Sequence, residues 1–261
     1  MRVAALYDIH GNLPALDAVL EEVALAGVDA YLIGGDVAPG PMTVEVLDRL
    51  EQLDGPVHYV MGNGDRELVE RFDAGPAADE ADDPIAQINA WCAARLPPEH
   101  RDLLAAFQPR VTLDLDGLGP TLFCHGSPRG DTEIITSLTG EDRLGPMLAA
   151  VDEATVVCGH THRQFDYVRA GKRVVNAGAV GMPYEGRRGA FWALLGGPGV
   201  ELHETSYDVE RALDRLRAGG CPGIEEALRE SLLEPADPDW VADLFERSAV
   251  KPRPHLADEE A

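Results

Sequence analysis

The first third of the chain alternates short apolar runs with amphipathic stretches, and few folds accommodate that pattern. Apolar runs at residues 3–7, 30–33 and 57–61 have the length and composition of buried strands. Between them, apolar side chains recur at helical spacing, first after Asn12 and then before Gly55-Pro56. Such alternation predicts parallel strands joined by right-handed crossovers, and therefore an α/β fold.

A potential metal ligand follows each of these three strands. Asp8 and His10 come after the first strand, Asp36 after the second and Asn63 after the third. Polar groups at the carboxyl ends of parallel strands meet beyond one edge of the sheet, so these side chains should converge. Side chains two residues apart on an extended segment face the same way, which would let Asp8 and His10 hold one ion together.

The second half of the chain contains short β-rich runs and tight turns, which favour antiparallel pairing. Three histidines follow such runs, His125 in one turn and His160 with His162 in another. A single histidine at a strand end is more often an ordinary polar residue than a metal ligand. The ordered set of acids, amide and imidazoles, each at a strand end, instead favours a metal site.

Together these motifs resemble the calcineurin-like metallophosphoesterase superfamily, and most closely its small single-domain bacterial and archaeal phosphodiesterases. The matching motifs are Asp8-x-His10, Gly35-Asp36, Gly62-Asn63, His125 and Gly159-His160-x-His162. The resemblance extends over about residues 1–207. It implies a four-layer α/β/β/α sandwich of two mixed β-sheets flanked by helices.

The resemblance also implies a dinuclear metal site with a shared carboxylate. The first ion would be held by Asp8, His10, Asp36 and His162, and the second by Asp36, Asn63, His125 and His160. Asp36, Asn63 and His125 form the implied catalytic set. Mixed imidazole and oxygen donors suit two divalent ions, manganese first, with iron, zinc and nickel as alternatives. The implied reaction is hydrolysis of a phosphate ester by a hydroxide that bridges the ions.

One position departs from the pattern of many relatives, which carry a histidine after the asparagine of the third motif. That histidine helps to protonate the leaving group, and the residue here is Gly64. General acid catalysis is typically worth about 10²–10⁴-fold, so its absence penalises poor leaving groups most. We therefore expect phosphodiesters to be preferred over phosphomonoesters, and Gly64→His to raise monoesterase activity more than diesterase activity.

Two further residues are candidate substrate contacts. Arg129 follows the His125 turn and can reach a phosphate, although a surface ion pair is the commoner fate of arginine in so acidic a chain. Asn12 follows the first ligand pair and can either contact the substrate or cap the helix that begins there. The sequence does not decide between these alternatives.

Composition limits the partners. The net charge of −24 disfavours binding to long nucleic acid, which rewards clustered basic residues. No apolar run approaches the roughly 18 residues of a membrane span, and the first strand begins without a signal peptide before it. We therefore expect a cytoplasmic hydrolase acting on a small phosphate ester, with nucleotides among the candidates. The oligomeric state is not indicated.

A second function is compatible with the same motifs, namely a catalytically silent metal-binding scaffold of the same fold for protein partners. Competent residue types at every ligand position argue against it. The domain organisation is predicted as one domain over residues 1–250, with a helical insertion or cap at 73–107. Residues 73–84 read as an acidic loop, residues 251–261 as a polar, frayed tail, and the last 44 residues, from 218 to 261, offer no functional motif.

Overall fold

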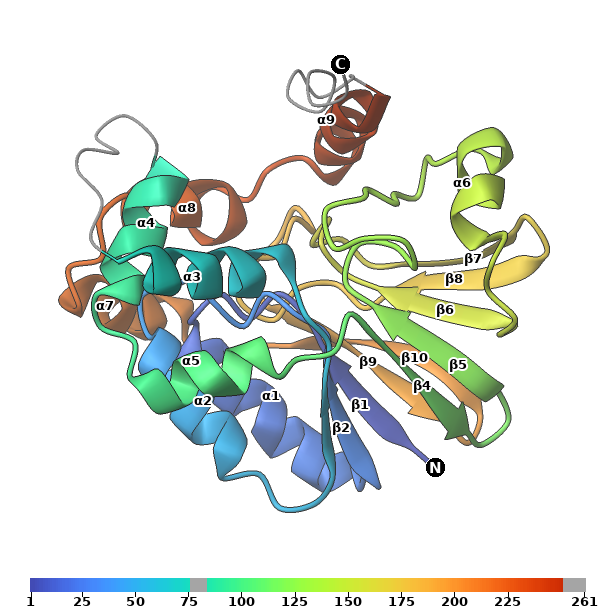
Figure 1. Ribbon diagram of the computed structural model, residues 1–261, viewed down its shortest axis with the longest axis horizontal. Coiled ribbons are helices and arrows are strands. Elements are labelled where there is room, and N and C mark those ends of the chain that lie inside the picture. Colours follow the sequence, from blue (N-terminus) through green and yellow to red (C-terminus); the bar gives the residue numbers. More distant parts are fainter. Residues whose placement is uncertain (76–83, 251–261) are drawn as a thin grey trace.

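Two five-stranded sheets form the centre of the protein in the computed structural model, which describes residues 1–75 and 84–250 (Figure 1). In the first sheet the strand order is β10 (Gly199–Thr205), β9 (Ala190–Gly196), β1 (Val3–Leu6), β2 (Ala30–Ile33) and β3 (Val57–Tyr59). In the second it is β4 (Arg110–Leu115), β5 (Gly119–Cys124), β6 (Thr155–Cys158), β8 (Lys172–Asn176) and β7 (Phe165–Arg169). The predicted tail and most of the predicted acidic loop lie outside the described residues.

Both sheets are mixed, as the resemblance implies. Strands β1, β2 and β3 are parallel, which confirms the prediction for the first third of the chain. The antiparallel expectation for the second half holds for strands joined by tight turns, which are β4–β5, β7–β8 and β9–β10, and β9 also pairs antiparallel with β1. Strands β5, β6 and β8 pair in parallel. The long connection between β5 and β6, which contains helix α6 (Glu141–Leu148), permits this crossover.

Alternating side chains on each strand build two separate apolar layers. Val3, Ala5 and Tyr7 point toward the second sheet, where they pack with Phe123 and Val157 in a core shared by both sheets. The intervening side chains of β1 point toward helices instead. A third apolar cluster lies between the second sheet and α6. The result is the four-layer α/β/β/α sandwich, and this fold prediction is confirmed.

Most helices cover the outer face of the first sheet (Figure 1). They are α1 (Leu13–Ala26), α2 (Thr43–Glu51), α3 (Asn63–Ala74), α4 (Pro84–Ala93), α5 (Pro98–Ala105) and α7 (Val209–Ala218). Helix α1 buries Leu16, Val19, Leu20 and Val23, the apolar face expected from its spacing. The predicted insertion is two helices, α4 and α5, separated at Pro97-Pro98 as the sequence indicates.

The C-terminal region adds three further helical elements, α8 (Ile224–Leu228), a π-helical turn at Arg229–Leu233 and α9 (Pro238–Val250). Arg163 ties the start of α9 to the loop after β6, since its guanidinium donates to Pro238 O at 2.7 Å and pairs with Asp239 at 3.0 Å. Among the described residues, no helix is long and apolar enough to span a bilayer.

Candidate metal centre

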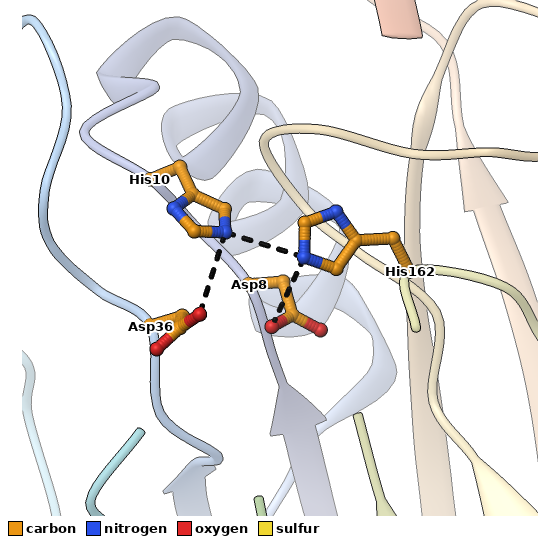
Figure 2. Close-up of side chains that lie close together, drawn as sticks. All are labelled: Asp8, His10, Asp36 and His162. Carbon is orange, nitrogen blue, oxygen red and sulfur yellow. Dashed lines mark hydrogen bonds and ion pairs between the residues drawn. The ribbon is translucent and has the colours of Figure 1, made fainter. Parts of the chain in front are cut away.

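The predicted ligands converge where the carboxyl ends of strands from both sheets meet. Asp8 and His10 follow β1, Asp36 follows β2, and Asn63 is the first residue of α3. His125 follows β5 in the second sheet, and the loop after β6 carries His160 and His162. Figure 2 shows Asp8, His10, Asp36 and His162 pointing toward one another. The structure therefore places side chains up to 154 positions apart, Asp8 and His162, in one cluster.

Two groups of potential ligand atoms share one carboxylate. The groups consist of Asp8, His10, Asp36 and His162, and of Asp36, His125 and His160. Within each group the candidate atoms lie within 4.8 Å of one another. Asp36 Oδ2 is 3.7 Å from His10 Nε2 and 3.4 Å from His125 Nε2, so the same oxygen faces both groups. This is the arrangement that a carboxylate bridging two ions requires.

Asn63 lies between two glycines that contact Asp36. The backbone N–H of Gly64 donates to Asp36 Oδ1 at 2.7 Å, and Gly62 packs directly against Asp36. Asn63 Oδ1 is buried and has no hydrogen-bond partner among the described residues, and neither do Asp8 Oδ1 and His125 Nε2. Buried polar atoms without partners are costly, and three of them beside one cluster fit a bound cation.

Backbone carbonyls orient three of the imidazoles. His162 Nδ1 lies 2.7 Å from Met182 O, His125 Nδ1 lies 3.0 Å from Gly34 O, and His10 Nδ1 lies 3.4 Å from Pro39 O. In each ring an Nδ1–H that donates to the carbonyl leaves the lone pair on Nε2, and Nε2 is the atom that faces the cluster. Histidines that bind metal ions are held in this way, with the second nitrogen hydrogen-bonded to the protein.

The electrostatics of the cluster favour cations. Burial raises the pKa of Asp36, but His125 and the other imidazoles outweigh it and hold that pKa below its usual range. The pKa of Asp8 is lowered in the same way, by His162 and His125 against burial. Burial lowers the pKa of His160 to about 4, and His125 lowers it further. Burial lowers the pKa of His125, but Asp36 outweighs it and raises that pKa to about 10. The metal-free cluster at neutral pH therefore combines two ionised carboxylates, a neutral His160 and a protonated His125, and an ion bound at His125 Nε2 would displace that proton.

The backbone at the ligands is strained. Asp8, His10, Asp36, His160 and His162 have φ between 46° and 66°, the left-handed region that non-glycine residues rarely adopt. Elsewhere in the part of the chain that the structure describes, Ala170 alone among non-glycine residues shares it. Each such residue costs about 1–3 kcal/mol and persists where function holds it. The expectation that Asp8 and His10 converge through extended geometry is therefore wrong, because left-handed turns bring them together.

Gly64 has no room for a side chain. A Cβ atom there would lie 2.6 Å from the backbone oxygen of Ala38 and 2.8 Å from Pro39 Cδ. Contacts this short between carbon and backbone oxygen do not occur without displacement of the loop. The packing therefore argues against the expectation that Gly64→His raises monoesterase activity more than diesterase activity, since the loop after β2 occupies the space that the imidazole stem needs.

Asp65 supports the two loops that carry Asp36 and Asn63. It is fully buried, and its carboxylate accepts N–H groups from Ala38 at 3.0 Å and Gly62 at 3.1 Å. Through the second bond Asp65, the third residue of α3, accepts the backbone N–H of the N-cap residue Gly62 and so caps the start of the helix. Burial raises the pKa of Asp65 to about 7, nearby Asp36 adds to the increase, and the two N–H groups oppose it.

Replacing Asp65 by alanine should lower the free energy of unfolding by about 1–3 kcal/mol, because two buried N–H groups lose their acceptor. Urea denaturation of the metal-free protein measures this effect. Asp73→Ala is the matched control, because Asp73 lies on the same helix and pairs only at the surface with Arg101. Equal midpoints for the two variants would contradict the supporting role of Asp65.

Of the two candidate substrate contacts, Asn12 borders the cavity beside the ligands and Arg129 does not. Asn12 is buried and caps α1, since its Oδ1 accepts the N–H of Ala15 at 3.2 Å. Its Nδ2 donates to Gly181 O at 3.0 Å, so both ends of the amide have protein partners although the residue borders the cavity described next. Arg129 is not at this cavity. It forms a surface ion pair with Glu133, the alternative that the sequence left open.

A cavity of about 280 Å³ opens onto the ligands. Its polar part includes His10, Asp36, Asn63, His160 and His162. The rest of its lining could not be predicted from the sequence, and it includes Met182 and Tyr184 from the loop after β8 and Phe245 from α9. The ring of Tyr184 stacks on His162, with centroids 5.2 Å apart and an interplanar angle of 15°. No local motif distinguishes these side chains from ordinary core residues.

Comparison with known proteins agrees with this geometry. The calcineurin-like phosphoesterase superfamily domain matches residues 1–195. A bis(5'-nucleosyl)-tetraphosphatase (symmetrical) from Baumannia cicadellinicola subsp. Homalodisca coagulata is 29% identical over 133 residues. That match covers 50% of this chain and 44% of the relative, so the chain spans less than half the length of that curated protein.

Two solved structures share the fold over nearly their whole length. A metallophosphoesterase from Sphaerobacter thermophilus is 26% identical, with a TM-score of 0.69, and the match covers 90% of this chain and 98% of that one. A hypothetical protein from Pyrococcus horikoshii OT3 has a TM-score of 0.73 at 22% identity, over 88% and 97% of the two chains. Given the family match over residues 1–195 and the clustered motifs, the chain belongs to the calcineurin-like phosphoesterase superfamily.

Proposed function

We propose that the protein is a metal-dependent hydrolase that cleaves phosphate esters at a dinuclear centre and prefers phosphodiesters. The observation that carries the proposal is the shared carboxylate: Asp36 belongs to both groups of clustered ligand atoms. Seven side chains would hold the two ions, and they are Asp8, His10, Asp36, Asn63, His125, His160 and His162. Manganese is the proposed metal, because carboxylate, amide and imidazole donors without thiolate suit it.

The chain's own residues prepare the site before substrate arrives. When bound, two divalent ions would activate a water molecule and neutralise charge on the phosphoryl oxygens. Asp36 would hold both ions at a fixed separation, and its contact with the Gly64 N–H keeps the carboxylate in one orientation. Asn63 and His125 would hold the second ion beside the cavity, and the Gly34 carbonyl keeps the His125 ring aligned.

The preference for diesters follows from what stands at position 64. With glycine there, the loop offers no imidazole to protonate the leaving group, so activated or diester leaving groups are favoured over simple alkoxides. The curated relative supports a small phosphate-ester substrate, because its name describes cleavage of a dinucleoside tetraphosphate. Nucleotides are therefore among the proposed substrates.

Hydrolysis of bis-p-nitrophenyl phosphate tests the proposal directly. Metal-stripped protein should be inactive, and adding Mn²⁺ should restore turnover of the diester in preference to p-nitrophenyl phosphate. Both esters release the same chromophore, so the rates can be compared in one absorbance assay. The metal content of the restored protein should approach two ions per chain.

Each other outcome has a distinct meaning. Equal or faster monoester turnover would keep the metal site and contradict the diester preference. Absence of turnover with any divalent metal, despite two ions bound, would favour the scaffold function over the enzyme. A single bound ion with full activity would contradict the dinuclear centre.

A further inference from the structure

The cavity that opens onto the metal ligands has a second wall, and that wall is apolar. Ile88 comes from α4, Leu216 from α7, Ile224 and Leu228 from α8, and Phe245 from α9. Of these helices only α4 lies within residues 1–195, the region that matches the superfamily domain. The C-terminal region, which carries no recognisable motif, therefore supplies most of this apolar wall.

The wall is firmly packed onto the rest of the protein. Ile88, Leu216, Ile224 and Leu228 belong to the core that covers the first sheet. The start of α8 lies against α4, since a Cβ built at Gly223 would be 3.7 Å from Ile88 Cδ1. In Figure 1, α4 and α8 are neighbours, and α9 stands apart from them beyond the carboxyl ends of the strands.

Helix α9 is held on both sides of Phe245. Glu246 accepts hydrogen bonds from Thr136 Oγ1 at 2.8 Å and Thr139 Oγ1 at 2.9 Å, and it pairs with Arg143. Arg163, which follows the ligand His162, holds the first turn of α9. These contacts fix the position of the Phe245 ring at the border of the cavity.

Aromatic rings connect the metal ligands to this wall. The His162 imidazole stacks on Tyr184 at 5.2 Å, and the Tyr184 ring lies 6.2 Å from Phe245 at an angle of 46°. Tilted and offset ring pairs at these separations are favourable. A group attached to a phosphate at the ligands would lie along these rings.

The charge of the lining restricts the phosphate as well. Among the described residues that line the cavity there is no lysine or arginine, and outside the ligand set there is one acid, Glu67. A phosphodiester carries one negative charge, which the ions can neutralise. A polyphosphate carries several, and the additional phosphates would meet an apolar wall and a carboxylate. The volume of about 280 Å³ is also at the small end of the range for ligand pockets.

We infer that α4 and the C-terminal helices form a substrate-selecting wall, and that the preferred substrate is a singly charged phosphodiester carrying an apolar, ring-containing substituent rather than a polyphosphate. This inference rests on the proposed function, because it concerns the substituent next to the phosphate that the metal centre would cleave. It also gives the helical insertion the role of a cap.

Two diesters with the same leaving group test the inference. Phenyl p-nitrophenyl phosphate and methyl p-nitrophenyl phosphate carry the same charge, release the same product and differ only in the substituent that would contact the wall. We expect wild-type kcat/KM to favour the phenyl ester by at least about tenfold, as burial of an apolar ring against apolar side chains predicts. A dinucleoside tetraphosphate should be hydrolysed more slowly than the phenyl ester.

Comparing the phenyl-to-methyl ratio of kcat/KM between the wild-type protein and variants cancels the intrinsic difference in reactivity between the two esters. Phe245→Ala should reduce the phenyl-to-methyl ratio several-fold, and Phe245→Leu, which keeps an apolar side chain, should retain most of it. Leu244→Ala is the matched control, because Leu244 is on the same helix, is 47% exposed and is not among the lining residues. It should leave the ratio at the wild-type value.

The outcomes separate the inference from the proposed function. If both esters are hydrolysed and neither Phe245→Ala nor Leu244→Ala changes their ratio, the substrate-selecting wall is contradicted. The proposed phosphodiesterase activity stands in that case. Faster hydrolysis of the dinucleoside tetraphosphate than of the phenyl ester would overturn the substrate class. No turnover of any ester by the wild-type protein with two ions bound would overturn the proposed function, and this inference with it.

Discussion

Asp36→Asn should abolish turnover of bis-p-nitrophenyl phosphate and lower the occupancy of both metal ions. The asparagine keeps the shape of the side chain and can still accept the N–H of Gly64, so the fold should persist. The asparagine lacks the negative charge of the Asp36 carboxylate, whose Oδ2 atom faces both ligand groups. Loss of metal assistance costs several kcal/mol, so kcat/KM should fall by roughly a thousandfold or more. Metal analysis by mass spectrometry, with steady-state kinetics, measures both effects.

A second carboxylate provides the control for Asp36→Asn. Asp166 lies on β7, is exposed and pairs with Arg173 at 2.5 Å, and it belongs to neither group of candidate ligand atoms. Asp166→Asn should leave metal content and turnover at wild-type values. Wild-type diester hydrolysis by Asp36→Asn would show that Asp36 does not bridge the ions.

Gly64→His should destabilise the protein and reduce the hydrolysis of both monoesters and diesters. The β-carbon alone would lie 2.6 Å from Ala38 O and 3.1 Å from Asp36 Oδ1, so the start of α3 must move. That movement breaks the bond between the Gly64 N–H and Asp36 and displaces Asn63. Overpacking of this kind typically costs about 1–3 kcal/mol of unfolding free energy. Urea denaturation and parallel assays with the two nitrophenyl esters give the comparison.

Gly145→Ala is the appropriate control for a glycine substitution. Gly145 lies in α6, and a Cβ built there has no heavy atom within 4 Å. Alanine should leave activity unchanged, and no helix stabilisation is expected from it because residue 145 precedes Pro146, whose ring crowds a Cβ at the preceding helical position. If Gly64→His were as stable as the wild-type protein and gained monoesterase activity, the loop would have room for the imidazole. The only effect of the glycine would then be to remove the general acid.

The close packing around Gly64 is linked to the absence of a histidine in the third motif. The loop from Ala38 to Pro39 occupies the space of a side chain at position 64, so the missing histidine and the close packing are one structural feature. A variant that restores the acid must therefore also change this loop. The proposed diester preference does not depend on which change came first.

Much of this site follows from local sequence. The strand ends at Asp8, Asp36 and His125 could be predicted because apolar runs stop there and glycines lie in the turns that follow. The cap at Asn12 was one of two roles compatible with its place before an amphipathic stretch, and its hydrogen bond to Ala15 N–H decides for the cap. Ligand types in a fixed order along the chain were enough to indicate the family, since the order of strands determines which side chains reach the same edge.

Tertiary structure decided the features that depend on distant contacts. The left-handed backbone at the ligands, the parallel pairing of β5, β6 and β8, and the closed space at Gly64 have no local signature. The apolar wall is another such feature, because Ile88 and Phe245 resemble core residues until the fold places them at one cavity. Local sequence determines which groups are available and where strands end, whereas packing between segments that are distant in the sequence determines which groups meet and what space remains between them.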